Sequence, residues 1–276
     1  MTKMKRFLAI VLAVVMCLAI VGCDKKDEPA APAASTPESS AQTVAATEDN
    51  ADNTTSSGTL VMATNASFPP YEYYENEKIV GIDAEVAELI AQKLGMTLEI
   101  KDMEFSSIIG AVQTGSVDFG MAGMTVTEER LVTVDFSDTY ATAVQSVIVK
   151  EDSEIAAVED LEGKKIGVQE STTGDIYATD DFGDENVKRF SKGNDAVAAL
   201  SAGIVDAVII DNEPAKNYVA ANEGLKILDT SYAEEEYAIA ISKDNTELKD
   251  KINAALAELK ADGTLDAIVA KYIPEN

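Results

Sequence analysis

Histidine and tryptophan are absent from this chain of 276 residues, and cysteine occurs only twice. The absence of histidine excludes a Ser-His-Asp or Cys-His nucleophile pair and any zinc site that uses histidine ligands. Basic residues are also scarce, with 22 lysines and arginines against 49 aspartates and glutamates and a net charge of -27. Such a surface repels nucleic acid, and no basic stripe with interleaved aromatic residues offsets the repulsion, so we expect no nucleic-acid partner.

Both cysteines lie near the N-terminus. Cys17 falls in the apolar run 7–21, which follows a basic segment, and this arrangement is typical of a signal peptide. The run is too short to be a good permanent membrane span. Residues 20–23, Ile-Val-Gly-Cys, resemble a bacterial lipobox, in which Cys23 would be lipidated and become the mature N-terminus. We therefore predict a signal peptide over 1–22 and a lipid anchor that holds the protein outside the cytoplasm, at the cell membrane or in the periplasm. An ordinary secretory signal with an incidental cysteine is the alternative.

The segment that follows the second cysteine is rich in Ala, Pro, Ser, Thr and acidic residues and has almost no bulky apolar residues. It cannot bury enough apolar surface to offset the entropy lost on folding, so residues 23–57 are predicted to form a lipidated cysteine followed by a disordered tether. A flexible coil of this length has an end-to-end distance of roughly 30 Å. The tether would keep a folded body near the membrane and leave it free to turn.

From residue 58 onward, strand-like and helix-like patterns alternate along the chain. Apolar and β-branched runs predict strands over 60–63, 97–101, 117–122, 165–168, 187–190, 205–210, 225–228 and 237–241. Apolar residues at helical spacing predict helices over 84–94, 106–115, 172–179, 196–202, 214–221, 248–259 and 264–272, with Asp83 as the cap of the first. This alternation favours an α/β fold with mainly parallel sheets flanked by helices.

The alternation falls into two series, and the segments between them, 143–150 and 232–242, have the pattern of extended chain. We interpret these segments as two strands that cross between two lobes, which places a cleft between the lobes. The predicted first lobe comprises 58–143 together with 238–276, and the predicted second lobe comprises 144–237.

Residues 123–130, Gly-Met-Thr-Val-Thr-Glu-Glu-Arg, follow a predicted strand and begin a predicted helix. Backbone N–H groups at a helix start, two hydroxyl groups and the guanidinium of Arg130 would together suit a carboxylate or a phosphate. The alternative is that Thr127 is only an N-cap and that Arg130 is a solvated residue of the first turn.

Polar residues and a glycine follow several of the predicted parallel strands. They are Asn65, Gly123, Gln169 and Asp211, and open α/β sheets bind ligands at this edge. Asp211 would supply the charge opposite to that of Arg130, so the pair would suit a zwitterion, whose charged groups are costly to bury unpaired. Asp211 could instead be a helix N-cap ahead of Pro214.

Several short motifs occur in a characteristic order. They are Phe-Pro-Pro-Tyr at 68–71, Gly-Ile-Asp-Ala-Glu at 81–85, the stretch at 123–130, Asp-Phe-Ser at 135–137, Gly-Val-Gln at 167–169, Thr-Thr-Gly at 172–174 and Asp-Ala-Val-Ile-Ile-Asp at 206–211. Together they resemble the extracytoplasmic solute-binding proteins of polar amino-acid ABC transporters, over residue 60 to the C-terminus. The resemblance implies a monomeric receptor with no cofactor. Its two lobes would close over one free L-amino acid and present it to the transmembrane subunits of an ABC permease.

The resemblance also implies roles in binding the charged groups of the ligand. Arg130 would pair with the α-carboxylate, and Asp211 would pair with the α-ammonium group. Hydroxyl or backbone groups of Thr125, Thr172 and Thr173 would also contact the carboxylate. The carbonyl of Gly123 would also contact the ammonium group.

The ligand's side chain would be enclosed by Phe68 and Phe105, although aromatic residues also pack commonly as ordinary core. Asn65 and Gln169 occupy positions that vary among relatives with the ligand chosen, so we expect them to recognise the side chain. Their neutral amides favour a polar uncharged ligand, whereas the acidic surface would favour arginine or lysine by electrostatic steering. We predict no function for the acidic run 234–236, which has the pattern of a solvated surface.

Two other function classes fit the same resemblance. A dehydratase on this scaffold would need a general acid or base, for which Glu170 is a candidate, but no paired carboxylate is placed for catalysis. A sensory domain would need a transmembrane helix and a further domain. We therefore expect a binding protein rather than an enzyme.

Overall fold

The structure is a computed structural model that describes residues 58–229 and 232–274. The predicted signal peptide, Cys23 and the predicted tether lie outside the described residues. Among the residues described, no helix is long and apolar enough to cross a membrane.

The first sheet forms the centre of the first lobe and combines parallel with antiparallel strands. Its order is β5 (Thr97–Asp102), β1 (Thr59–Thr64), β6 (Phe119–Gly120), β14 (Ala240–Ile241) and β7 (Asp135–Phe136). β1 pairs in parallel with β5 and β6, whereas β14 is antiparallel to β6 and β7. Since β14 follows the second series along the chain, the C-terminal part of the chain returns to this sheet.

The second sheet forms the centre of the second lobe. Its order is β10 (Val187–Phe190), β9 (Ile166–Gln169), β11 (Ala207–Asp211), β8 (Ala141–Lys150) and β12 (Leu225–Ile227), and β13 (Ala233–Tyr237) also pairs with β8. β10, β9 and β11 are parallel, and β8 is antiparallel to its neighbours. Both sheets are therefore mixed. They are parallel where strand and helix alternate and antiparallel where the chain passes between the lobes.

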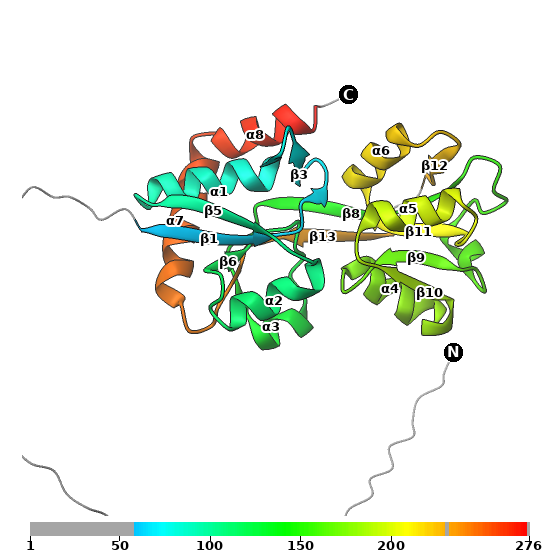
Figure 1. Cartoon of the computed structure of the whole chain (residues 1–276), viewed down its shortest axis with the longest axis horizontal. Helices are drawn as coiled ribbons and strands as arrows, with labels where there is room; N and C mark the ends of the chain where they lie inside the picture. Colours follow the sequence, from blue (N-terminus) through cyan, green and yellow to red (C-terminus); the bar gives the residue numbers. More distant parts are fainter. Residues whose placement is uncertain (1–57, 230–231, 275–276) are drawn as a thin grey trace, which may run out of the picture. The chain divides into compact units, whose positions relative to one another are not determined.

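Helices cover both sides of each sheet, as the alternation predicts (Figure 1). In the first lobe, α1 and α8 lie on one side and α2 and α3 on the other, while α7 packs against α1 and α8. In the second lobe, α5 and α6 lie opposite α4. The bounds are α1 (Ile82–Lys93), α2 (Phe105–Gln113), α3 (Glu128–Thr133), α4 (Thr173–Phe182), α5 (Gly193–Ser201), α6 (Asn212–Ala221), α7 (Thr246–Ala261) and α8 (Thr264–Tyr272). Short 3-10 helices, η1 (Val158–Leu161) and η2 (Asp184–Asn186), and a small sheet of β2 (Ser67–Phe68), β3 (Glu72–Glu75) and β4 (Lys78–Val80) complete the described part.

A two-stranded ribbon joins the two lobes. The first half of β8 pairs with β13 in an antiparallel register that sets Ala141 opposite Tyr237 and Gln145 opposite Ala233. Figure 1 shows β8 and β13 running side by side between the lobes. The prediction of two crossing strands is therefore confirmed, whereas the exact residue ranges of the lobes stay a prediction.

Local differences from the predicted elements have identifiable causes. β6 is shorter than predicted, because the chain leaves the sheet before Gly123, which has φ of +52°. α6 begins at Asn212 and places Pro214 in its first turn, where the missing N–H of proline has no helical partner to lose. The prediction that Asp83 caps α1 is wrong, since the N-cap position is Gly81 and no side chain caps the helix.

Candidate functional site

A cavity lies where the strand ends of the two sheets face each other. It is narrow in this closed structure and is lined by Asn65, Phe68, Glu72, Phe105, Ala122, Gly123, Thr125, Arg130, Gln169, Thr172, Thr173 and Asp211. The structure thus brings together all the residues that the sequence predicted as ligand contacts. Glu72 and Ala122 are the lining residues that the sequence analysis missed. The contacts of these residues with a ligand stay a prediction.

Arg130 is buried at the centre of this lining, with 8% of its surface exposed. Its guanidinium donates a hydrogen bond of 2.7 Å to the carbonyl of Thr125 and one of 2.9 Å to the carbonyl of Ser171, which belongs to the second lobe. The same group lies 5.3 Å from the centre of the Phe105 ring. The alternative that Arg130 is a solvated residue is therefore wrong, although Thr127 does cap α3 by accepting from the Arg130 N–H at 3.2 Å.

The second lobe meets Arg130 with the loop that begins α4. Thr172 is the N-cap of this helix, and its hydroxyl donates to the carbonyl of Gln169 at 2.8 Å. The N–H of Asp175 is capped by the Thr172 hydroxyl, whereas the N–H groups of Thr173 and Gly174 have no carbonyl partner within the helix and could meet an anion. Thr172 and Thr173 line the cavity at this point. The helix N-terminus that faces the cavity is therefore that of α4. It lies beside the guanidinium of Arg130, which belongs to α3.

Gly123 is needed at its position for two reasons. Its φ of +52° lies in the left-handed region, and a Cβ atom built on it would meet Cε1 of Phe68 at 2.9 Å. Its N–H donates a hydrogen bond of 2.8 Å to a carboxylate oxygen of Asp83, and the Tyr140 hydroxyl donates to the same oxygen at 2.9 Å. Asp83 therefore anchors the Gly123 loop from the first lobe instead of capping α1.

Asp211 lies at the end of β11 with 6% of its surface exposed. It occupies the N-cap position of α6, but its side chain makes no capping hydrogen bond and instead accepts from the Tyr237 hydroxyl. Burial and, second to it, the nearby charge of Glu235 raise the pKa of Asp211 to about 7. A cation in the cavity would favour the ionised form of this carboxylate, so Asp211 is suited to an ammonium group.

Glu72 adds a second carboxylate to the lining. It is 1% exposed, and its Oε2 atom has no hydrogen-bond partner among the described residues. Burial raises the pKa of Glu72 well above its ordinary range, and the neighbouring Asp83 contributes to the same direction. Burial likewise raises the pKa of Asp83 to about 7. The cavity wall near Gly123 is therefore rich in carboxyl groups.

The sequence analysis predicted that Glu235 lies on a solvated surface, and the structure shows that this prediction is wrong. It is 5% exposed, and its Oε2 accepts hydrogen bonds from the Thr125 hydroxyl at 3.0 Å and from the Gln145 amide at 3.1 Å. The same amide donates to the Thr173 hydroxyl at 3.3 Å. Glu235 thus links lining residues of both lobes from the ribbon behind them.

Asn65 and Gln169 contact each other across the cleft. The Gln169 amide donates to the Asn65 side-chain oxygen at 3.0 Å, and the Asn65 amide donates to the carbonyl of Met103 at 2.7 Å. Further cross-lobe hydrogen bonds run from the Tyr218 hydroxyl to the carbonyl of Ser67 and from the Arg130 guanidinium to the carbonyl of Ser171. The structure therefore shows the lobes closed on each other.

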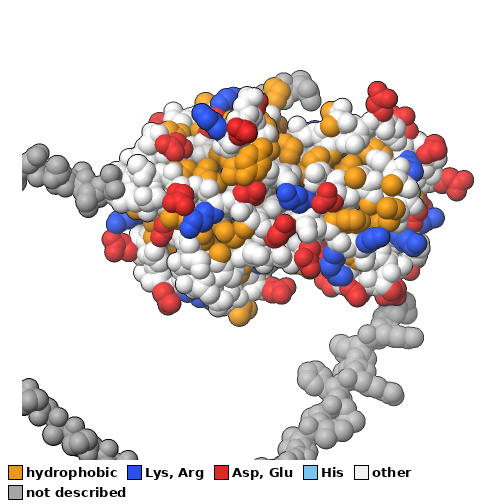
Figure 2. Space-filling view, viewed as in Figure 1, with side chains coloured by type: hydrophobic (Ala, Val, Ile, Leu, Met, Phe, Trp, Pro, Cys, Tyr) orange, Lys and Arg blue, Asp and Glu red, His pale blue; other side chains and the backbone are white. Residues whose placement is uncertain are grey.

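The molecular surface outside the cavity reflects the excess of acidic residues in the composition. Acidic side chains are spread over the face seen in Figure 2, with lysines and arginines among them. Within residues 58–229 and 232–274, no group of three or more cysteine, aspartate or glutamate side chains is placed to hold a metal ion.

Comparison with known proteins connects this architecture to a family. Residues 60–275 match the model of the bacterial extracellular solute-binding proteins, family 3. The arginine-binding extracellular protein ArtP of Bacillus subtilis is 38% identical over 221 residues, which are 77% of this chain and 85% of ArtP. An ancestral arginine-binding protein, solved with glutamine bound, is 44% identical with a TM-score of 0.75, over 79% of this chain and 99% of the other.

A third relative is named for three amino acids. The arginine-, lysine-, histidine-binding protein ArtJ of Geobacillus stearothermophilus is 36% identical with a TM-score of 0.75, over 79% of this chain and 96% of ArtJ. Proteins of this family are binding proteins without catalysis, so the dehydratase alternative is set aside. The family match over nearly all of the described chain agrees with the cleft between two mixed sheets and with the residues that line this cleft. The protein therefore belongs to the bacterial extracellular solute-binding proteins, family 3.

Proposed function

We propose that this protein captures an amino acid with a cationic side chain, L-arginine first among them, and delivers it to a membrane permease. Its family and relatives establish the general activity: the chain is the extracytoplasmic amino-acid-binding component of an ABC importer. The proposal concerns the ligand and the residues that bind it.

The observation that carries the proposal is the balance of charge around the cavity. Among the described residues, Arg130 is the one basic side chain that lines the cavity, whereas Glu72 and Asp211 also line the cavity and Asp83 and Glu235 lie directly behind its wall. A neutral zwitterion brings no net charge, so the buried carboxyl groups beyond the partner of its ammonium group would stay protonated, as the raised pKa of Glu72 indicates. A ligand with one further positive charge would stabilise the ionised forms and reduce the cost of burying them. The names of ArtP and ArtJ point to the same class of ligand.

Within this proposal, the lining residues have distinct roles. The α-carboxylate pairs with Arg130, helped by Thr125 and by the backbone at Thr172 and Thr173. The α-ammonium group binds Asp211 and the carbonyl of Gly123. The side chain lies against aromatic and amide groups, those of Phe68, Phe105, Asn65 and Gln169.

Capture would use a closure of the two lobes about the ribbon of β8 and β13. We propose that 58–143 with 238–276 and 144–237 each move as a unit, so that the hydrogen bonds of Arg130 to Ser171 and of Gln169 to Asn65 form on closure. We also propose that lipid at Cys23 holds the receptor beside its permease. Attachment of several acyl chains would give firm anchoring, whereas a single chain is marginal.

A binding screen tests the ligand class. The purified chain is titrated calorimetrically with L-arginine, L-lysine, L-histidine, L-glutamine and L-glutamate, and its thermal unfolding is followed with each. A ligand at one hundred times its Kd stabilises the folded state by about 2.7 kcal/mol, which a thermal scan detects readily. We expect arginine to bind more tightly than glutamine. Tighter binding of glutamine would show that the amides of Asn65 and Gln169, rather than the carboxyl groups, set the specificity.

A further inference from the structure

We infer that Arg189, which does not line the cavity, is a positioning residue that holds the loop 170–173 in the conformation that meets Arg130 across the cleft. This inference rests on the proposed function, because it assigns to Arg189 a part in ligand capture. The evidence is a chain of contacts that runs from β10 through α4 to the cavity.

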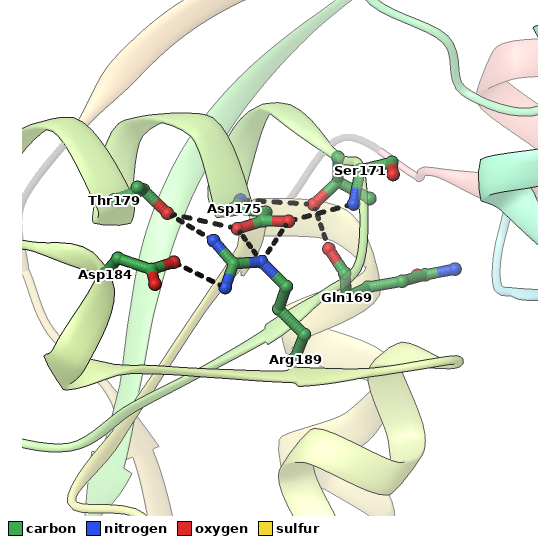
Figure 3. Close-up of polar contacts among 7 residues, drawn as sticks. Gln169, Ser171, Asp175, Thr179, Asp184 and Arg189 are labelled. Carbon is green, nitrogen blue, oxygen red and sulfur yellow. Dashed lines mark hydrogen bonds and ion pairs between the residues drawn. The ribbon is translucent and has the colours of Figure 1, made fainter.

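Arg189 makes contacts with three side chains of the second lobe (Figure 3). Its Nε lies 2.9 Å from a carboxylate oxygen of Asp175, and its other nitrogens donate to Asp184 at 2.8 Å and to the Thr179 hydroxyl at 2.9 Å. Asp175 and Thr179 belong to α4 and are themselves joined by a hydrogen bond of 3.2 Å. The guanidinium therefore fixes the first two turns of α4 against the edge strand β10.

Asp175 carries this constraint to the loop. Its carboxylate accepts a hydrogen bond of 3.0 Å from the backbone N–H of Ser171, as Figure 3 shows. Ser171 has φ of +64°, a left-handed conformation that a residue with a side chain rarely adopts and that surrounding contacts must hold in place. The hydrogen bond from Ser171 to Asp175, with Arg189 behind it, is such a contact.

The conformation of Ser171 matters because its carbonyl lies opposite the binding site's cation. This carbonyl accepts a hydrogen bond of 2.9 Å from the Arg130 guanidinium, and the next residues, Thr172 and Thr173, line the cavity. If residue 171 rotated to an ordinary conformation, the carbonyl would turn away from Arg130. The cross-lobe bond would then be lost, and the α4 start would no longer be held at the ligand. Arg189 thus acts on the ligand through Asp175 and Ser171.

The chain offers a matched control. Asp184 also pairs with Arg189, but its side chain is 73% exposed and it makes no contact with the loop 170–173 in the described structure. Removing its charge should leave the link from Arg189 to Asp175 intact. The variants Arg189→Met and Asp184→Asn therefore separate the loss of an ion pair from the loss of the positioning contact.

The first measurement needs no ligand. Amide hydrogen exchange of the full chain is compared for wild type, Arg189→Met and Asp184→Asn. We expect exchange at residues 171–173 to become at least about tenfold faster in Arg189→Met and to stay within about twofold in Asp184→Asn, because only the first change releases Asp175. Unchanged exchange at these residues in Arg189→Met would overturn the inference.

The second measurement tests whether the greater mobility of residues 171–173 weakens ligand binding. We expect Arg189→Met to weaken L-arginine binding about tenfold, mainly through faster dissociation, and Asp184→Asn to change it by less than about twofold. Ser171→Gly, which tolerates the left-handed conformation, should reduce the effect of Arg189→Met to less than about threefold in the double variant. A general loss of stability would weaken binding equally in both backgrounds, and that result would refute the positioning role. If wild type bound no amino acid, the proposed function would fail, while the exchange experiment would still decide the role of Arg189.

Discussion

Replacing Arg130 with lysine tests the proposed role of this residue in ligand binding, because the change keeps the charge and removes the planar fork of donors. The guanidinium already donates to the carbonyls of Thr125 and Ser171 at 2.7 and 2.9 Å, and its remaining N–H groups make no other hydrogen bond within the described part of the chain, so they could meet a carboxylate. A lysine ammonium has three donors on one nitrogen and cannot span these two carbonyls and a bidentate ligand together. The variant should therefore fold but bind poorly.

The expected magnitude follows from the bonds lost. A hydrogen bond to a charged group contributes about 1.5–3 kcal/mol, and we expect the variant to lose the equivalent of one to two such bonds. A loss of about 3 kcal/mol corresponds to affinity that is roughly 100-fold weaker. Since the positive charge remains beside Asp211 and Glu235, we expect the stability of the ligand-free protein to change much less than its affinity.

Calorimetric titration with L-arginine measures the affinity, and circular dichroism on the same samples measures the thermal unfolding. Glu128→Gln is the matched control, because Glu128 lies in the same short helix, is exposed and does not line the cavity. Binding by Arg130→Lys within about threefold of wild type would show that no bidentate contact with the ligand exists, and the assignment of Arg130 to the α-carboxylate would be wrong.

Further expectations concern the ammonium side and the cavity wall. Since burial and Glu235 raise the pKa of Asp211 to about 7, lowering the pH from about 8 to about 6 should protonate this carboxyl and weaken binding, and constant affinity over this range would contradict an ammonium contact. Glu235→Gln removes one charge that raises the pKa of Asp211, so titrations at several pH values should show the loss of binding at a lower pH, whereas the exposed Glu234→Gln should not shift it. Gly123→Ala should cost at least about tenfold in affinity, measured by calorimetry, because its Cβ would meet Phe68 at 2.9 Å.

The positions of the main cavity-lining residues could be predicted from the sequence because each depends on local pattern. Asn65 directly follows a strand, Gln169 and Asp211 each end one, and the ends of parallel strands meet at one edge of a sheet whatever the details of packing. Arg130 and Thr127 likewise mark a helix start that the structure contains. For these residues, the periodicity of the sequence was sufficient to predict their positions in the structure.

Glu235 could not be placed by composition, because its neighbours are identical to it. Glu234 and Glu236 are exposed, while Glu235 is buried, since successive residues of a strand point to opposite faces. That alternation was the available signal, and the fully buried Tyr237, two residues further along the strand, marks the same inward face. Gln145 lies on the other strand of the ribbon, and its contacts depend on how two distant segments pair.

Asp83 shows a second limit of local reasoning. An aspartate beside the start of a helix is a common cap, yet burial places this one under the loop of Gly123, which is 40 residues further along the chain. Glu72, the first residue of β3, also lines the cavity. In both cases the side chain's partners belong to another element, and no pattern within its own segment indicates them.

The paired strands between the lobes also limit how the molecule can move. β13 ends at Tyr237 and β14 begins at Ala240, so only Ala238 and Ile239 separate the ribbon from the first sheet, and both are fully buried. Two bodies joined by adjacent chains resist sliding and stretching, and the easiest motion left is rotation about one axis across the links. A receptor with one easy rotation has few intermediate shapes. Its permease could then distinguish a loaded receptor from an empty one by outline alone, whichever amino acid lies inside.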